Sequence, residues 1–157
     1  MSNEVITSAL LVIASVIAVV AFVNAILPSV QGMAYSYNSL ADDMEVEVTT
    51  DMDIIFISSQ GDNISVWIKN VGSSRIPLSH LSMSDFFITS SSVYWHPNFQ
   101  DNSTPTWDYT LENGGGNTWD SGETIMANIE LSSLPSDTYN INFVLYNGVS
   151  DSDIFSK

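Results

Sequence analysis

The sequence contains no cysteine, and only three of its 157 residues are basic: Lys69, Arg75 and Lys157. Without cysteine, no disulfide can cross-link the fold and no thiol nucleophile is available. The 18 acidic residues give a net charge of −15, which argues against nucleic acid as a partner, because phosphate binding depends on lysine and arginine. These absences remove several classes of function before any motif is considered.

Catalytic and metal-binding motifs are also scarce. The two histidines, His80 and His96, stand in separate segments without a neighbouring motif that would orient them for catalysis. The glycine run 114–116 lacks the lysine and the following helix of a phosphate-binding loop. The carboxylates are scattered and do not show the spacing of a calcium-binding loop. The sequence therefore predicts no catalytic residues, no metal site and no cofactor.

The most informative feature present is a long apolar run near the N-terminus. The nineteen residues from Val5 to Val23 carry no charge. This length approaches the ~20 apolar residues that cross a ~30 Å hydrocarbon layer as a helix. No basic residue precedes the run, as one would in a cleavable signal, so we predict a retained anchor, with a removed segment as the alternative.

A more polar stalk is expected to follow the apolar run. The helix is predicted to reach about residue 43, with Pro28 as a possible kink or interruption. Residues 1–43 are thus assigned to the helix and its stalk, and residues 44–157 to a separate extracytoplasmic domain.

Small residues recur at helical spacing within the apolar run. They are Ala14, Ala18, Ala21 and Ala25. A stripe of this kind lets helix backbones approach closely, so it predicts packing against other helices. The alternative is that alanine is simply common in membrane helices.

From about Val46 the pattern changes to the alternation of apolar and polar residues that is typical of β-strands. The predicted strands cover residues 53–58, 64–69, 85–89, 125–131 and 139–146. Turns rich in glycine and asparagine separate them. Several short strands without intervening helices predict an all-β, immunoglobulin-like sandwich.

Two further features are candidates for surface function. The irregular stretch 92–121 holds three tryptophans, Trp95, Trp107 and Trp119, which either cover an edge of the core or contact a partner. Asn-x-Ser/Thr sequences begin at Asn63 and Asn102, and they are candidate N-glycosylation sites if the domain lies outside the membrane.

Three segments also carry a family resemblance. They are the apolar helix Val5–Leu27, the strand and turn at 64–73 (ISVWIKNVGS), and residues 119–125 (WDSGETI) with the two strands that follow. Together they resemble the archaellum accessory proteins of the FlaG/ArlG and FlaF/ArlF families, which are relatives of archaellin. The resemblance implies a long hydrophobic N-terminal helix, an immunoglobulin-like domain and no enzymatic activity.

This resemblance leads to a functional prediction. We expect a structural subunit of the archaeal motility machinery at the cell surface or in the pseudo-periplasm, either anchored in the membrane or incorporated in a filament. Its expected partners are copies of itself or sibling archaellum subunits, the membrane, and surface-layer protein. Two alternatives stay open: a membrane-anchored binding module that uses the tryptophan-rich stretch, and the main archaellin filament subunit itself.

Overall fold

The computed structural model describes residues 2–157 and contains two compact units, which meet between Met44 and Glu45. The sequence placed this boundary one residue earlier. The first unit is helical, and the second contains the end of that helix and all of the strands.

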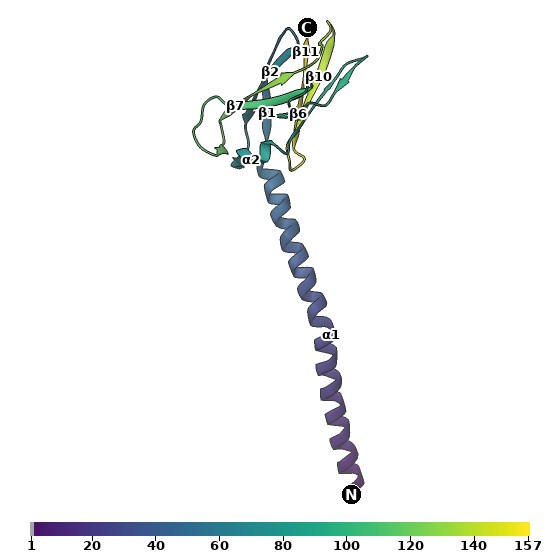
Figure 1. Ribbon diagram of the computed structural model, residues 1–157. Coiled ribbons are helices and arrows are strands. Elements are labelled where there is room, and N and C mark those ends of the chain that lie inside the picture. Colours follow the sequence, from purple (N-terminus) through teal and green to yellow (C-terminus); the bar gives the residue numbers. More distant parts are fainter. Residues whose placement is uncertain (1) are drawn as a thin grey trace. The chain divides into compact units, whose positions relative to one another are not determined.

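A single helix, α1 (Ser2–Thr49), makes up the N-terminal part of the chain (Figure 1). Pro28 lies inside it, and the predicted interruption there does not occur. The helix also continues to Thr49 instead of ending near residue 43, because hydrogen bonds within the second unit satisfy its last carbonyl groups. The Thr49 carbonyl oxygen, for example, accepts the N–H groups of Ser73 and Ser74 at 2.9 and 3.1 Å.

Two sheets form the body of the second unit. The five-stranded sheet has the order β1-β2-β9-β7-β6, with β1 Met52–Gln60, β2 Asn63–Asn70, β9 Thr124–Glu130, β7 Thr106–Leu111 and β6 Asn98–Phe99. The four-stranded sheet has the order β11-β10-β4-β5, with β11 Ser150–Ser156, β10 Thr138–Val144, β4 Asp85–Thr89 and β5 Tyr94–Trp95. A small third sheet and a short helix complete the unit, with β3 Ile76–Pro77, β8 Thr118–Trp119 and α2 Leu78–Leu81.

The core lies between the two main sheets and follows from the alternation in the strands. Ile64, Val66 and Ile68 of β2 are all fully buried, while the residues between them face outward. Across the core, Phe86 stacks on Phe143 with ring centroids 4.5 Å apart. The predicted long helix followed by an all-β, immunoglobulin-like sandwich is therefore confirmed.

One pair of sheet edges is also joined directly. The Ile54 N–H of β1 donates to the Asp151 carboxylate of β11 at 2.7 Å. Because this bond satisfies a donor on the outer strand of one sheet, it ties the two sheets together at that side of the sandwich.

Candidate functional site

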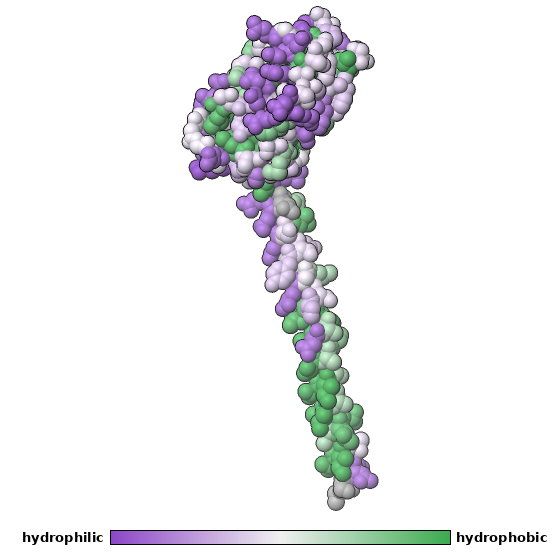
Figure 2. All heavy atoms as spheres, in the orientation of Figure 1, coloured by the Kyte–Doolittle hydropathy of each residue, from purple (hydrophilic) through white to green (hydrophobic). Residues whose placement is uncertain are grey.

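The apolar part of α1 has no cover within one copy of the chain. Every large apolar side chain between Val5 and Leu27 is at least 41% exposed. Within residues 2–157, α1 is the one helix long and apolar enough to cross a membrane, and none of its most apolar stretch is buried. Figure 2 shows this hydrophobic part of the helix beside its more polar continuation. Lipid or neighbouring helices must therefore cover it.

The alanine stripe lies on one face of this helix. At 100° per residue, Ala14, Ala18, Ala21 and Ala25 fall within about 60° of one another around the axis. All four are exposed, so the stripe is available to a neighbouring helix. Its role in packing stays a prediction.

The end of α1 is held by a turn of the sandwich, residues 70–74, which we call the clasp. Four consecutive N–H groups, from Val71 to Ser74, donate to the chain at the helix end. The first two bond the Asp51 carbonyl oxygen and the last two bond that of Thr49, at 2.9–3.1 Å. The Thr49 and Ser74 hydroxyls are also 2.6 Å apart. The clasp therefore binds the last helical turn into the second unit.

Asn70 organises the clasp from within. Its side chain is fully buried, and its amide nitrogen donates to the carbonyl oxygens of Ser74 and Trp119 at 2.9 and 3.0 Å. Its side-chain oxygen accepts the N–H of Gly72 at 3.1 Å. The sequence predicted only a chain reversal at Asn70 and Gly72. The structure adds that the same two residues hold the end of the helix.

We expect Asn70→Asp to destabilise the second unit by about 3 kcal/mol or more. The change removes both N–H donors and points a carboxylate at two carbonyl oxygens in a buried position. Urea unfolding of the full chain in detergent, followed by tryptophan fluorescence, measures the effect. Asn140→Asp, on an exposed residue of β10, is the control and should change stability little. Equal effects at the two positions would contradict the role of Asn70.

Two of the three predicted contact tryptophans are core residues. Trp107 is 1% exposed and Trp119 is fully buried, with its indole N–H bonded to the Glu123 carbonyl oxygen at 2.9 Å. The expectation that they contact a partner is therefore corrected, because neither presents surface to one. Trp95 is half-buried and packs against Tyr139 with ring centroids 5.9 Å apart.

The aromatic residues around Trp107 extend the core to the edge of the five-stranded sheet. Phe99 lies against both Trp107 and Tyr109, with ring centroids 4.8 and 5.9 Å apart. The Tyr109 hydroxyl donates to the Leu78 carbonyl oxygen at 3.1 Å, and partial burial raises the pKa of this hydroxyl above its ordinary value. Packing is thus the role of four aromatic residues of the stretch 92–121: Phe99, Trp107, Tyr109 and Trp119.

A pair of exposed aromatic residues lies elsewhere, on the outer face of the five-stranded sheet. Phe56 and Trp67 pair across β1 and β2 with ring centroids 5.2 Å apart, and Met126 of β9 pairs with Trp67 on its other side. Phe56 is 58% exposed, and the other two are half-exposed. We call Phe56 and Trp67, with Met126 beside them, the aromatic patch. Sequence reasoning missed it, although the outward positions of the predicted strand 64–69 include Trp67.

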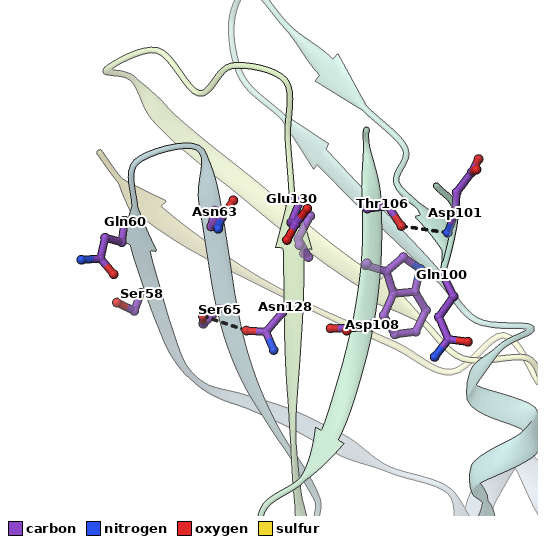
Figure 3. Close-up of a pocket in the computed structure, with 12 residues that line it drawn as sticks. Ser58, Gln60, Asn63, Ser65, Gln100, Asp101, Thr106, Asp108, Asn128 and Glu130 are labelled. Atoms are coloured by element: carbon purple, nitrogen blue, oxygen red, sulfur yellow. Dashed lines mark hydrogen bonds between the residues drawn. The ribbon is translucent and has the colours of Figure 1, made fainter. Parts of the chain in front are cut away.

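A polar groove of about 490 Å³ continues this face beyond the aromatic patch (Figure 3). It is lined by Ser58, Gln60, Asn63, Ser65, Gln100, Asp101, Thr106, Trp107, Asp108, Asn128, Ile129 and Glu130. Within it, the Ser65 hydroxyl donates to the Asn128 side-chain oxygen at 3.2 Å. The lining contains amides, hydroxyls and three carboxylates but no base. The groove can therefore hydrogen-bond a hydroxyl-rich or cationic group, and it disfavours anions.

Both glycosylation candidates lie near this groove. Asn63 begins β2 and lines it, and Asn102 follows the lining residue Asp101. Both side chains are exposed. Their modification stays a prediction, with access as its structural support.

The histidines occupy unrelated positions, as their sequence context predicts. His96 bonds the Asp85 carboxylate at 2.9 Å on the surface, and His80 packs against Tyr146 with ring centroids 4.5 Å apart. Among the residues that the structure describes, no three metal-binding side chains of histidine or carboxylate type gather into one cluster.

The exposed apolar helix and the sandwich define the class of the protein: a structural subunit with a hydrophobic N-terminal helix and a β-sandwich head. The comparison with known families then identifies it. Residues 2–155 match the family of archaeal-type flagellin, and the chain belongs to that family. The family is one of structural proteins of the archaellum, so the chain is a non-enzymatic archaellum component.

Individual relatives share the sequence or the fold of this chain. An uncharacterized protein of Archaeoglobus fulgidus is 42% identical over 164 residues, which cover 99% of both chains. The archaellum periplasmic stator protein FlaG of Sulfolobus acidocaldarius has a similar fold, with a TM-score of 0.59 and 24% identity over 68% of this chain and 99% of FlaG. A chain of the periplasmic stator complex of FlaF and FlaG gives 0.57 and 24%, over 66% of this chain and 87% of that one. The predicted resemblance is thus confirmed.

Proposed function

We propose that the chain is a stator-like subunit of the archaellum, which assembles through α1 and docks to sibling subunits through its sandwich. One observation carries the proposal: a helix with an uncovered apolar surface leads into a sandwich with the fold of FlaG. A stationary motor part needs an anchor and an external head, and the two units suit these tasks. FlaF and FlaG form a complex, which supports sibling subunits as partners here.

The proposed location is the pseudo-periplasm, with α1 in the membrane or in a bundle of helices. Each large apolar side chain of α1 gains about 1.5–3 kcal/mol when it leaves water, so a free helix in solution is strongly disfavoured. The face of the sandwich seen in Figure 2 is mostly polar, which suits water. We propose surface-layer protein as a further partner of the sandwich on the same grounds of location.

The clasp supports a role under mechanical load. A force applied to the sandwich reaches the last turn of α1 through the hydrogen bonds of residues 71–74 to Thr49 and Asp51. These bonds act in parallel, so several must break together before the turn detaches. This is the connection that a subunit resisting torque needs.

Assembly through α1 is tested by enlarging the alanine stripe. Ala18→Phe places a bulky ring where helices are expected to approach closely, and it should weaken self-association about tenfold or more. Size-exclusion chromatography with light scattering, and electron microscopy of the full chain in detergent, measure the assembly. Val20→Phe, on another face of α1, is the matched control. Unchanged assembly of Ala18→Phe would count against the proposal, and micrometre-long filaments of this chain alone would instead identify the main filament subunit.

Docking is assigned to the aromatic patch. Partly exposed aromatic residues next to a polar groove match the apolar centre and polar rim of protein interfaces, and tryptophan is enriched among residues that dominate binding. Trp67→Ala should weaken binding to the sibling subunit by about 2 kcal/mol, or roughly 30-fold in affinity. Co-purification measures this loss. Tyr94→Ala is the control, because Tyr94 is 61% exposed on the other sheet. Equal losses of binding for Trp67→Ala and Tyr94→Ala would refute docking through the outer face of the five-stranded sheet.

The polar groove supports a second candidate function, a membrane-anchored binding module. Its amides and hydroxyls suit a polyhydroxylated ligand, such as a glycan. Titration of the full chain with neutral oligosaccharides, monitored by calorimetry, tests this candidate. Binding that Asn128→Ala abolishes, with assembly unchanged, would favour the module.

A further inference from the structure

The stalk of α1, beyond the apolar run, also exposes large apolar side chains. They recur with alternating spacings of three and four residues: Val30, Met33, Tyr37, Leu40 and Met44. Their exposed fractions are 54%, 67%, 74%, 56% and 55%. We call these five residues the seam. A single copy of the chain leaves the whole seam in water.

The spacing of the seam is that of a heptad repeat. If Val30 is position a, then Met33 and Leu40 are d positions, while Tyr37 and Met44 are a positions. The five side chains lie within about 80° of one another around a straight helix. The repeat also continues backward into the apolar run through Ile26, Val23, Val19 and Val16. Four successive heptads therefore keep an apolar residue at every a and d position.

The remaining stalk positions show that this pattern is not a result of general apolarity. Residues 31–43 outside the seam are small or polar with one exception, Tyr35, at position f. Positions e and g next to the seam include Ala34, Ser36 and Ala41, which leave room for a second helix. Tyr35 and Tyr37 are almost equally exposed, at 75% and 74%. They differ in their position in the repeat, so only Tyr37 belongs to the seam.

We propose that residues 30–44 form a parallel, in-register coiled coil with a second copy of this chain. A partner for the seam must be a helix with the same repeat at the same height. Copies anchored through α1 in one membrane satisfy both conditions, because their helices run in the same direction and start at the same depth. This step rests on the proposed function, which supplies the common anchor.

Charge also favours a second copy over an unlike partner. The a and d positions from Val30 to Met44 carry no charge, and from 30 to 41 neither do the flanking positions, so nothing there selects an oppositely charged helix. The next d position is Glu47, where two copies would bring like charges together. The seam thus ends at Met44, the last residue of the first unit.

The seam and the alanine stripe are separate surfaces. Their centres lie about 110° apart around the axis of a straight helix. One neighbour can pair with the seam while another packs on the stripe. An in-register pair also differs from a staggered stack of helices, in which each residue would face a different residue of its neighbour. The register is therefore the testable part of the proposal.

The cysteine-free chain allows a direct test by disulfide trapping. Tyr37→Cys and Tyr35→Cys each introduce the only thiol into the full chain, two residues apart and at nearly equal exposure. In an in-register coil, the two copies of residue 37 face each other within the Cα separation of about 4.4–6.8 Å that a disulfide requires, whereas position f points away. In membranes treated with a mild oxidant, we expect at least tenfold more disulfide-linked dimer for Tyr37→Cys.

Three outcomes would overturn the proposal. One is equal cross-linking at 35 and 37. Another is a mixture of Met33→Cys and Tyr37→Cys chains in which the unlike pair links more efficiently than either like pair, which would show a staggered arrangement. The third is full cross-linking of Leu40→Cys when Tyr37→Asp is also present, since a charge at position a should abolish the seam.

The test separates the seam from the proposed function. If α1 anchors the chain but the seam is unpaired, the variants stay in the membrane fraction, and Ala18→Phe still reduces assembly without selective cross-linking at 37. If the anchor itself is wrong, the chain is absent from the membrane fraction, whichever residue carries the thiol.

Discussion

Replacing Gly72 with alanine is expected to destabilise the second unit by about 2–4 kcal/mol. A Cβ atom at this position would lie 2.5 Å from the backbone nitrogen of Asp51 and 2.6 Å from the carbonyl oxygen of Thr49. Both are backbone atoms at the helix end, so no side-chain rotation can relieve the overlap. The turn must move away, and the hydrogen bonds from Gly72 and Ser73 to the helix end weaken with it.

Urea unfolding of the full chain in detergent measures this loss, and Gly115→Ala is the matched control. A Cβ at Gly115 meets no atom within 4 Å, so the control should leave stability nearly unchanged. Amide hydrogen exchange adds a local test, because the N–H groups of residues 71–74 should lose protection in Gly72→Ala before the core strands do. Wild-type stability in Gly72→Ala would show that the clasp is looser than its geometry indicates.

The parts of the fold with clear periodicity could be predicted from the sequence. The apolar run shows α1 by its length, and the strands at 64–69, 125–131 and 139–146 alternate with a period of two residues. These patterns are strong because each of these strands has one buried face, so its inward positions must be apolar. They correspond in the structure to β2, β9 and β10.

Other strands lack this signal for physical reasons. The edge strand β11 buries only Phe155 and carries acidic residues, so its sequence has the composition of a loop. In β7 the one buried position is filled by Trp107, a residue type that also occurs in exposed loops, and this hid the strand within the stretch 92–121. The end of α1 is set by bonds to the clasp, about 20 residues later in the chain, which no local pattern reveals.

The outer face of the five-stranded sheet shows the same limit. Its groove combines side chains from residues 58 to 130, which come together only through the order of the strands. The same order places the aromatic patch beside the groove, so neither feature can be predicted from the sequence alone. The tryptophans singled out in sequence were those in an irregular segment, whereas the half-exposed Trp67 lies in a regular strand. Strand regularity says nothing about which face a neighbouring sheet covers.

The second large effect is expected at Trp107. Its indole packs edge-on against Phe86 and Phe99, with ring centroids 5.0 and 4.8 Å apart, and it is 1% exposed. Trp107→Ala should therefore cost about 3–5 kcal/mol, since it leaves a large cavity lined by aromatic rings that cannot collapse easily. Thermal and urea unfolding of the full chain measure this cost.

Trp95→Ala is the control for Trp107→Ala, and it decides between packing and recognition. Trp95 is half-buried at the end of β5, so its removal should cost less than half as much. If Trp107 served a partner, its alanine variant would keep wild-type stability and lose only binding. If Trp107 fills the core, the alanine variant loses stability, and any loss of binding is proportional to the fraction of unfolded protein. The two outcomes exclude each other, because the Trp107 side chain can contact a partner only if it leaves the core.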